Sequence, residues 1–77
     1  MAALRFHWDF FGPDAQGTTD HFVKHLHEFC DREGITERKV WTSTDNARRV
    51  ATLECDERHL VLVRDRLRPK RADRPVA

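Results

Sequence analysis

Five histidines among 77 residues are the side chains of this sequence best suited to chemistry near neutral pH. Three of them, His21, His25 and His27, lie in one short stretch, and the first two are four residues apart. Side chains at that spacing project from one face of a helix, so these two imidazoles and the Glu28 carboxylate could bind a transition metal such as zinc. A solvated helix face explains the same residues, and no second element supplies a further ligand. We therefore expect no cofactor, with His21 and His25 as the candidate metal ligands.

Two cysteines are the candidate nucleophiles. Cys30 falls on the apolar stripe of a predicted helix, as an inert core residue would. Cys55 directly precedes a predicted helix N-terminus, where backbone N–H groups stabilise a thiolate, but the acidic residues 56 and 57 oppose that effect. Cys55 and His59 could form a nucleophilic pair across one helical turn, yet the sequence offers no oxyanion hole. We expect a non-enzymatic protein, with a metal-binding or thiol-reactive protein as one alternative.

Basic and aromatic residues on predicted strands could form a binding surface. Their spacing places them on one face of a sheet, with Trp41 among the basic groups and Val50 beside it. Basic groups around an exposed aromatic ring are features of a platform for single-stranded nucleic acid. A second copy of the same chain could bury that surface instead. The candidate nucleic-acid or partner-binding residues are Arg5, His7, Lys39, Trp41, Arg48, Lys70 and Arg71.

Charge is divided unevenly along the chain. Residues 64–77 contain six basic and two acidic side chains, whereas residues 1–63 contain eight basic and eleven acidic ones. A basic tail on an acidic body could fold back or reach for an anionic partner, and a solvated C-terminus explains it equally well. The acidic body argues against a strong phosphate-driven interaction. We expect one domain over residues 1–68 and a basic, disordered tail over residues 69–77.

The N-terminal half contains the clearest periodic patterns. Apolar and polar side chains alternate over residues 4–10, which predicts a strand that ends at Gly12 and Pro13. Apolar residues then recur at helical spacing over about fifteen residues, after a capping residue at 18–20. Gly34 followed by Ile35 is typical of a Schellman stop, in which glycine adopts the left-handed conformation.

The C-terminal half predicts a hairpin and a second helix. Residues 37–44 and 47–55 form the two strands, with Asp45 and Asn46 as the turn. The resulting register pairs Trp41 with Val50 and Val40 with Ala51. Neither face of the hairpin is cleanly apolar, and we expect the Val40 face to point inward. Asp56 can cap a helix that ends before Pro69, although residues 59–63 could also form a strand.

These elements predict an α+β fold, a β-α-β-β-α two-layer sandwich. The order resembles a ferredoxin-like split β-α-β unit lacking the last strand, with a right-handed connection between parallel strands. No apolar run approaches the ~20 residues that span a bilayer, and residues 1–11 lack the apolar core of a secretory signal. Two cysteines cannot form a disulfide framework, which favours a cytoplasmic location.

Size gives the best indication of function. A single core below about 80 residues rarely supplies more than ~3–5 kcal/mol, and self-association is a common remedy. A three-stranded sheet also leaves edges that a second chain could pair with. We therefore expect a small non-enzymatic binding or regulatory module that self-associates as a homodimer through a sheet edge or sheet face, with no membrane partner. The principal alternative is a nucleic-acid-binding accessory protein that uses the sheet face and the Arg-rich tail.

Overall fold

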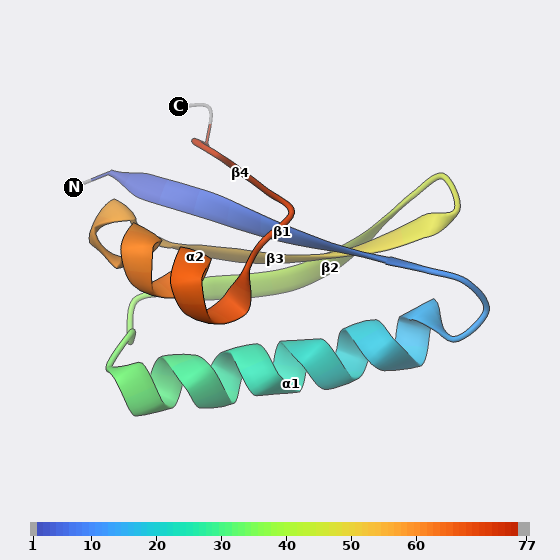
Figure 1. The fold of residues 1–77 in the computed structure, drawn as a ribbon, viewed down its shortest axis with the longest axis horizontal. Helices are drawn as coiled ribbons and strands as arrows, with labels where there is room; N and C mark the ends of the chain where they lie inside the picture. Colours follow the sequence, from blue (N-terminus) through green and yellow to red (C-terminus); the bar gives the residue numbers. More distant parts are fainter. Residues whose placement is uncertain (1, 76–77) are drawn as a thin grey trace.

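The computed structural model describes residues 2–75 as one antiparallel sheet with two helices packed on one of its faces (Figure 1). The expected α+β two-layer class is confirmed. In chain order the elements are β1 (Ala3–Phe11), α1 (Ala15–Glu33), β2 (Lys39–Asp45), β3 (Arg48–Asp56), a 3-10 turn η1 (Glu57–His59), α2 (Leu60–Leu67) and β4 (Arg71–Asp73). No helix in this described part of the chain is both long and apolar enough to cross a membrane.

The strand order is β2-β3-β1-β4. Strand β3 is antiparallel to both β1 and β2, so β1 and β2 run parallel with β3 between them, and α1 connects them. This is the split β-α-β unit that the element order predicts. The prediction that the last strand is missing is wrong, because β4 pairs with β1 and completes the β-α-β-β-α-β order.

Strand β4 also corrects the prediction of a disordered tail. The Lys70 N–H donates to the His7 carbonyl at 2.8 Å, and residues 71–73 then pair with residues 5–7 of β1. Only five residues lie between Pro69 and Pro75, too few for a pattern that predicts a strand from the sequence, and contacts with β1 decide the conformation. The last two residues of the predicted tail, 76 and 77, lie outside the described residues.

The core lies between the sheet and the two helices. The alternating apolar residues of β1 point into it, and Phe6 is 1% exposed. Leu26 of α1, Leu53 of β3 and Val63 of α2 meet Phe6 in one cluster. The indole N–H of Trp8 donates to the Leu67 carbonyl at 2.8 Å, which joins β1 to the end of α2.

Helix α1 begins earlier than the sequence predicts and ends at the predicted residue. It begins at Ala15, after Asp14, whose side chain makes no capping hydrogen bond. Gly34 adopts the left-handed conformation at φ 76°, and the Ile35 N–H donates to the Cys30 carbonyl at 2.8 Å. The Schellman stop is therefore confirmed, with Ile35 buried against the helix.

The hairpin has a different turn from the one predicted. Asp45 pairs with Arg48, so Asn46 and Ala47 form the loop, and Asn46 takes the positive φ of 56°. Trp41 consequently pairs with Thr52 instead of Val50, and Val40 with Leu53 instead of Ala51. A shift of two residues leaves every side chain on its predicted face, because side chains alternate with a period of two.

Residues 57–67 are helical, as the capping residue indicates, and the strand alternative for residues 59–63 is wrong. The Asp56 carboxylate accepts a hydrogen bond from the Arg58 N–H at 2.9 Å and caps η1, which continues into α2.

Candidate functional site

The sheet has one face without helices, which we call the open face. The strand registers place six of the predicted binding residues on it. These six are Arg5, His7, Lys39, Trp41, Arg48 and Arg71. Lys70 directly precedes β4 and joins the sheet through its backbone N–H.

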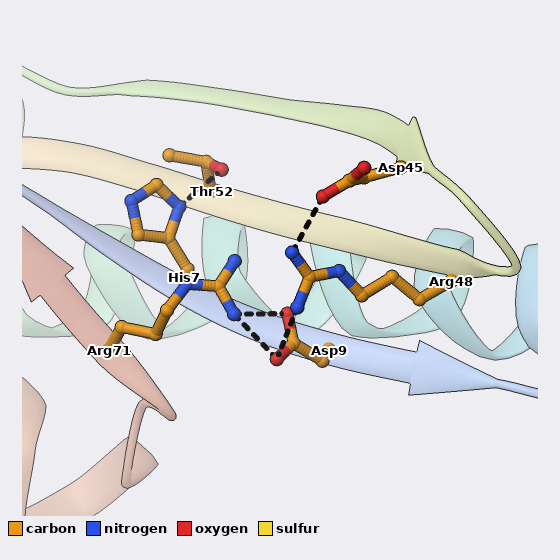
Figure 2. A network of polar contacts seen from close by, with 6 residues as sticks. All are labelled: His7, Asp9, Asp45, Arg48, Thr52 and Arg71. Carbon is orange, nitrogen blue, oxygen red and sulfur yellow. Dashed lines mark hydrogen bonds and ion pairs between the residues drawn. The ribbon is translucent and has the colours of Figure 1, made fainter.

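Acidic side chains pair with most of the basic groups on the open face, and Figure 2 shows the pairs of Arg48 and Arg71. Arg48 donates to Asp45 at 2.7 Å and to Asp9 at 3.5 Å. Arg71 donates to both carboxylate oxygens of Asp9, at 2.6 and 2.8 Å. The side chain of Asp9 is only 12% exposed, so two guanidinium groups enclose one nearly buried carboxylate. Asp9 thereby balances positive charge that an external anion would otherwise meet on this face.

His7 connects β4 to the middle of the sheet. Its Nδ1 lies 3.0 Å from the Thr52 hydroxyl, and its Nε2 lies 3.1 Å from the Asp73 carboxylate. Thr52 is buried although it faces away from the helices, because neighbouring side chains on the open face cover it. Both ring nitrogens of His7 are thus occupied by contacts that hold the sheet together.

Trp41 is the aromatic residue closest to the predicted stacking role. It is 36% exposed, and the Arg5 guanidinium lies 5.4 Å from its ring centroid. Arg5 also donates to Glu54 at 2.8 Å, so the cation above the ring is itself paired. Lys39 is the basic residue of the open face without an ion pair among residues 2–75. The open face is therefore close to charge-balanced, which does not favour a phosphate backbone.

The two edges of the sheet differ sharply. The β4 edge is three residues long, contains Arg71 and Asp73, and lies between Pro69 and Pro75. Short length, charge and proline are the features that protect an edge strand from pairing with another chain. The β2 edge is seven residues long, and its five central residues, VWTST, contain no charge, proline or glycine. This edge of β2 is unprotected.

The two candidate metal ligands lie together on the exposed face of α1. The Nε2 atoms of His21 and His25 are 2.8 Å apart, and His25 Nδ1 lies 3.2 Å from the Glu28 carboxylate. The third histidine of the stretch does not join them, since His27 Nδ1 accepts from Arg38 at 3.2 Å. Within residues 2–75, no group of three or more His, Cys, Asp or Glu side chains is arranged to hold a metal ion.

Both cysteines are buried, free thiols. Burial, together with smaller electrostatic contributions from Cys30, Asp56 and Glu54, raises the pKa of Cys55 to about 11. Burial likewise raises the pKa of Cys30. Because the thiolate is the nucleophile, these environments oppose the thiol chemistry considered from the sequence.

Sequence reasoning missed the acidic partners on the open face. Asp9 alternates with Arg5 and His7 along the same strand, and this period could have placed it beside them. Asp73 carries no comparable signal, because its contact with His7 spans 66 residues and depends on β4.

Comparison of the chain with protein-family models, with curated proteins and with solved structures found no match.

Proposed function

We propose that this protein is a non-enzymatic binding module that forms a homodimer through the β2 edges of two copies. The observation that carries the proposal is the contrast between the guarded β4 edge and the unprotected β2 edge. An exposed strand of this kind presents a row of N–H and C=O groups that another strand can pair with. Because natural proteins usually protect their edge strands, an unprotected edge favours a partner strand that covers it.

The sequence of β2 is complementary to itself. When two copies pair antiparallel about Thr42, Lys39 of each lies opposite Asp45 of the other. The pairs Val40–Thr44 and Trp41–Ser43 follow between them, and Thr42 meets its own copy on the twofold axis. Lys39, which has no ion pair among residues 2–75, thereby gains one, and no like charges are placed opposite each other.

This pairing joins two sheets into one continuous eight-stranded sheet. The twofold axis is perpendicular to the sheet, so both helical layers lie on one side and both open faces on the other. The two Trp41 side chains become diagonal neighbours, about 7–8 Å apart between their backbones, within reach of aromatic side chains. The joined open faces, with Trp41 at their centre, are the surface that the dimer offers to a further partner.

A charge-swap experiment tests this pairing. In Lys39→Asp, the new aspartate of each copy lies opposite Asp45 of the other copy. In Asp45→Lys, the new lysine of each copy lies opposite Lys39 of the other copy. Each variant alone is expected to raise the dimer dissociation constant about tenfold, since two favourable pairs of ~0.2–1 kcal/mol become repulsive. An equimolar mixture of the two variants restores both pairs, and sedimentation equilibrium is expected to show the mixed dimer.

The matched control is Lys70→Asp, which makes the same charge change at the opposite edge of the sheet. It is expected to leave the dissociation constant unchanged. A wild-type chain that remains monomeric at high micromolar concentration would refute the proposal. Equal weakening by Lys39→Asp and Lys70→Asp would show that net charge, not the β2 edge, governs association.

A further inference from the structure

We propose that His21 and His25 bind one divalent transition-metal ion on the exposed face of α1, and that Cu²⁺ fits the site better than Zn²⁺. The two histidines are one helical turn apart, and their Nε2 atoms converge to 2.8 Å. Their rings meet edge to face, with centroids 4.4 Å apart and an interplanar angle of 79°. This site lies on α1 and does not depend on the β2 edge.

Glu28 prepares His25 to act as a ligand. Its carboxylate oxygen lies 3.2 Å from His25 Nδ1 and can only accept a hydrogen bond, so the neutral imidazole carries its proton on Nδ1. The lone pair of His25 is then on Nε2, the atom that faces His21. Histidine ligands in metalloproteins commonly donate their second ring N–H to a carboxylate in this way, which fixes the tautomer and orients the ring.

The separation of the two nitrogens is short enough for one ion to bind both. Two ligands at about 2.0–2.1 Å from an ion lie about 2.9 Å apart at a right angle and about 3.3 Å apart at a tetrahedral angle. The 2.8 Å observed is the hydrogen-bond length of the metal-free pair, so both separations are reached by a small movement of the rings, and Cu²⁺ is preferred because it binds imidazole nitrogens more tightly than Zn²⁺ does. Zn²⁺ prefers a tetrahedral set with at least three protein ligands, and the described residues offer no such group here.

Metal binding requires one proton to move. In the metal-free pair His25 Nε2 is the acceptor, so His21 Nε2 is the donor of the shared hydrogen. The ion takes the place of that hydrogen, and the proton of His21 passes through solvent to its exposed Nδ1. Both imidazoles stay neutral, and water completes the coordination of the ion.

Calorimetric titration of the full chain with Cu²⁺ tests the site. His21→Ala and His25→Ala are each expected to weaken Cu²⁺ binding by more than tenfold, and Glu28→Gln by about tenfold through the loss of orientation. The matched control is His27→Ala, which removes a histidine from the same helix and is expected to leave binding unchanged. Electron paramagnetic resonance is expected to show two nitrogen ligands in the wild type and one in His21→Ala.

Zn²⁺ provides a second arm of the experiment. At stoichiometric concentration Cu²⁺ is expected to raise the melting temperature of the wild type, and Zn²⁺ is not. Equal Cu²⁺ affinity in the wild type and in both alanine variants would mean an adventitious ion only and would overturn the proposal. A Zn²⁺ shift as large as the Cu²⁺ shift, lost in His21→Ala, would overturn the preference for Cu²⁺.

Discussion

At the scale of single residues, Gly17 inside α1 and Gly34 directly after it allow the effect of backbone conformation to be measured apart from that of packing. Gly34 ends the helix at φ 76°, whereas Gly17 lies inside it without a positive φ, and a methyl group at either position meets nothing within 4 Å. Gly34→Ala is expected to lower the free energy of unfolding by about 1 kcal/mol, because an alanine in the left-handed region is strained. Gly17→Ala is expected to raise it by up to about 1 kcal/mol.

Chemical denaturation of the two variants beside the wild type measures this difference. If both substitutions shift the unfolding midpoint in the same direction, the Schellman stop does not contribute as we infer.

The buried thiols make stability depend on alkaline pH. The pKa of Cys55 is raised from 9.0 to about 11, so the folded state holds the thiol proton more tightly than the unfolded state does. Its stabilising contribution is complete below about pH 9 and is lost as the pH rises through about 11. Denaturation of wild type and Cys55→Ala across this range is expected to show a smaller decline in the variant.

Alkylation gives an independent test of Cys55. Iodoacetamide at pH 8 is expected to label the native protein far more slowly than the protein in urea, because the buried thiol is protonated. Rapid labelling of Cys55 in the native state would contradict its buried environment.

At the scale of the elements, β4 depends on ion pairs more than on apolar contacts. All three of its residues are exposed, and Arg71 joins it to the nearly buried Asp9. Arg71→Ala leaves Asp9 with only its longer contact to Arg48 and is expected to lower the free energy of unfolding by about 1 kcal/mol. Arg66→Ala, on the exposed surface of α2, is the control and is expected to change it little.

The salt dependence of stability distinguishes the ion pairs of β4 from its apolar contacts. The effect of Arg71→Ala in thermal unfolding is expected to shrink at high ionic strength, since the pair is partly solvated. An effect equal to that of Arg66→Ala at low salt would mean that β4 adds no stability.

How far the sequence predicts each element depends on the length of its pattern. The alternation in β1 and the apolar stripe of α1 extend over enough residues to specify both elements. The hairpin register fails by two residues, because Asp45 suits a turn by type yet pairs with Arg48 in the sheet. Strand β4 cannot be predicted locally, because contacts with residues more than sixty positions away stabilise it.

The candidate site likewise has a part that local sequence patterns predict and a part that depends on distant contacts. Alternation alone places Arg5, His7, Lys39, Trp41 and Arg48 on one face, and a register error of two residues preserves that result. The pairing of their charges needs the fold, because Asp9 and Arg71 meet only once β4 joins β1. An inventory of basic residues therefore overstates the free positive charge of the surface.

At the scale of the whole molecule, the small core and the open β2 edge are complementary features. Under the proposed pairing, a chain of 77 residues gains stability when a second copy extends its sheet, and of the two sheet edges within residues 2–75 the β2 edge is the one whose central residues carry no charge or proline. In the same proposal, the short and charged β4 edge stops the sheet from growing into a chain of molecules. The arrangement predicts a closed dimer and no larger assembly.

Disulfide trapping of Thr42→Cys tests this pairing most directly. Residues directly opposite in an antiparallel pair have Cα atoms about 4.5–5.5 Å apart, within the range of a disulfide, and Thr42 is opposite its own copy. Thr44→Cys is the matched control, because it is on the same face of β2 but its two copies are offset by about 13 Å along the strands. Under mild oxidation we predict a covalent dimer from Thr42→Cys at low micromolar concentration and none from Thr44→Cys or from the wild type. Equal cross-linking of the two cysteine variants, or none in Thr42→Cys, would contradict a dimer formed through β2.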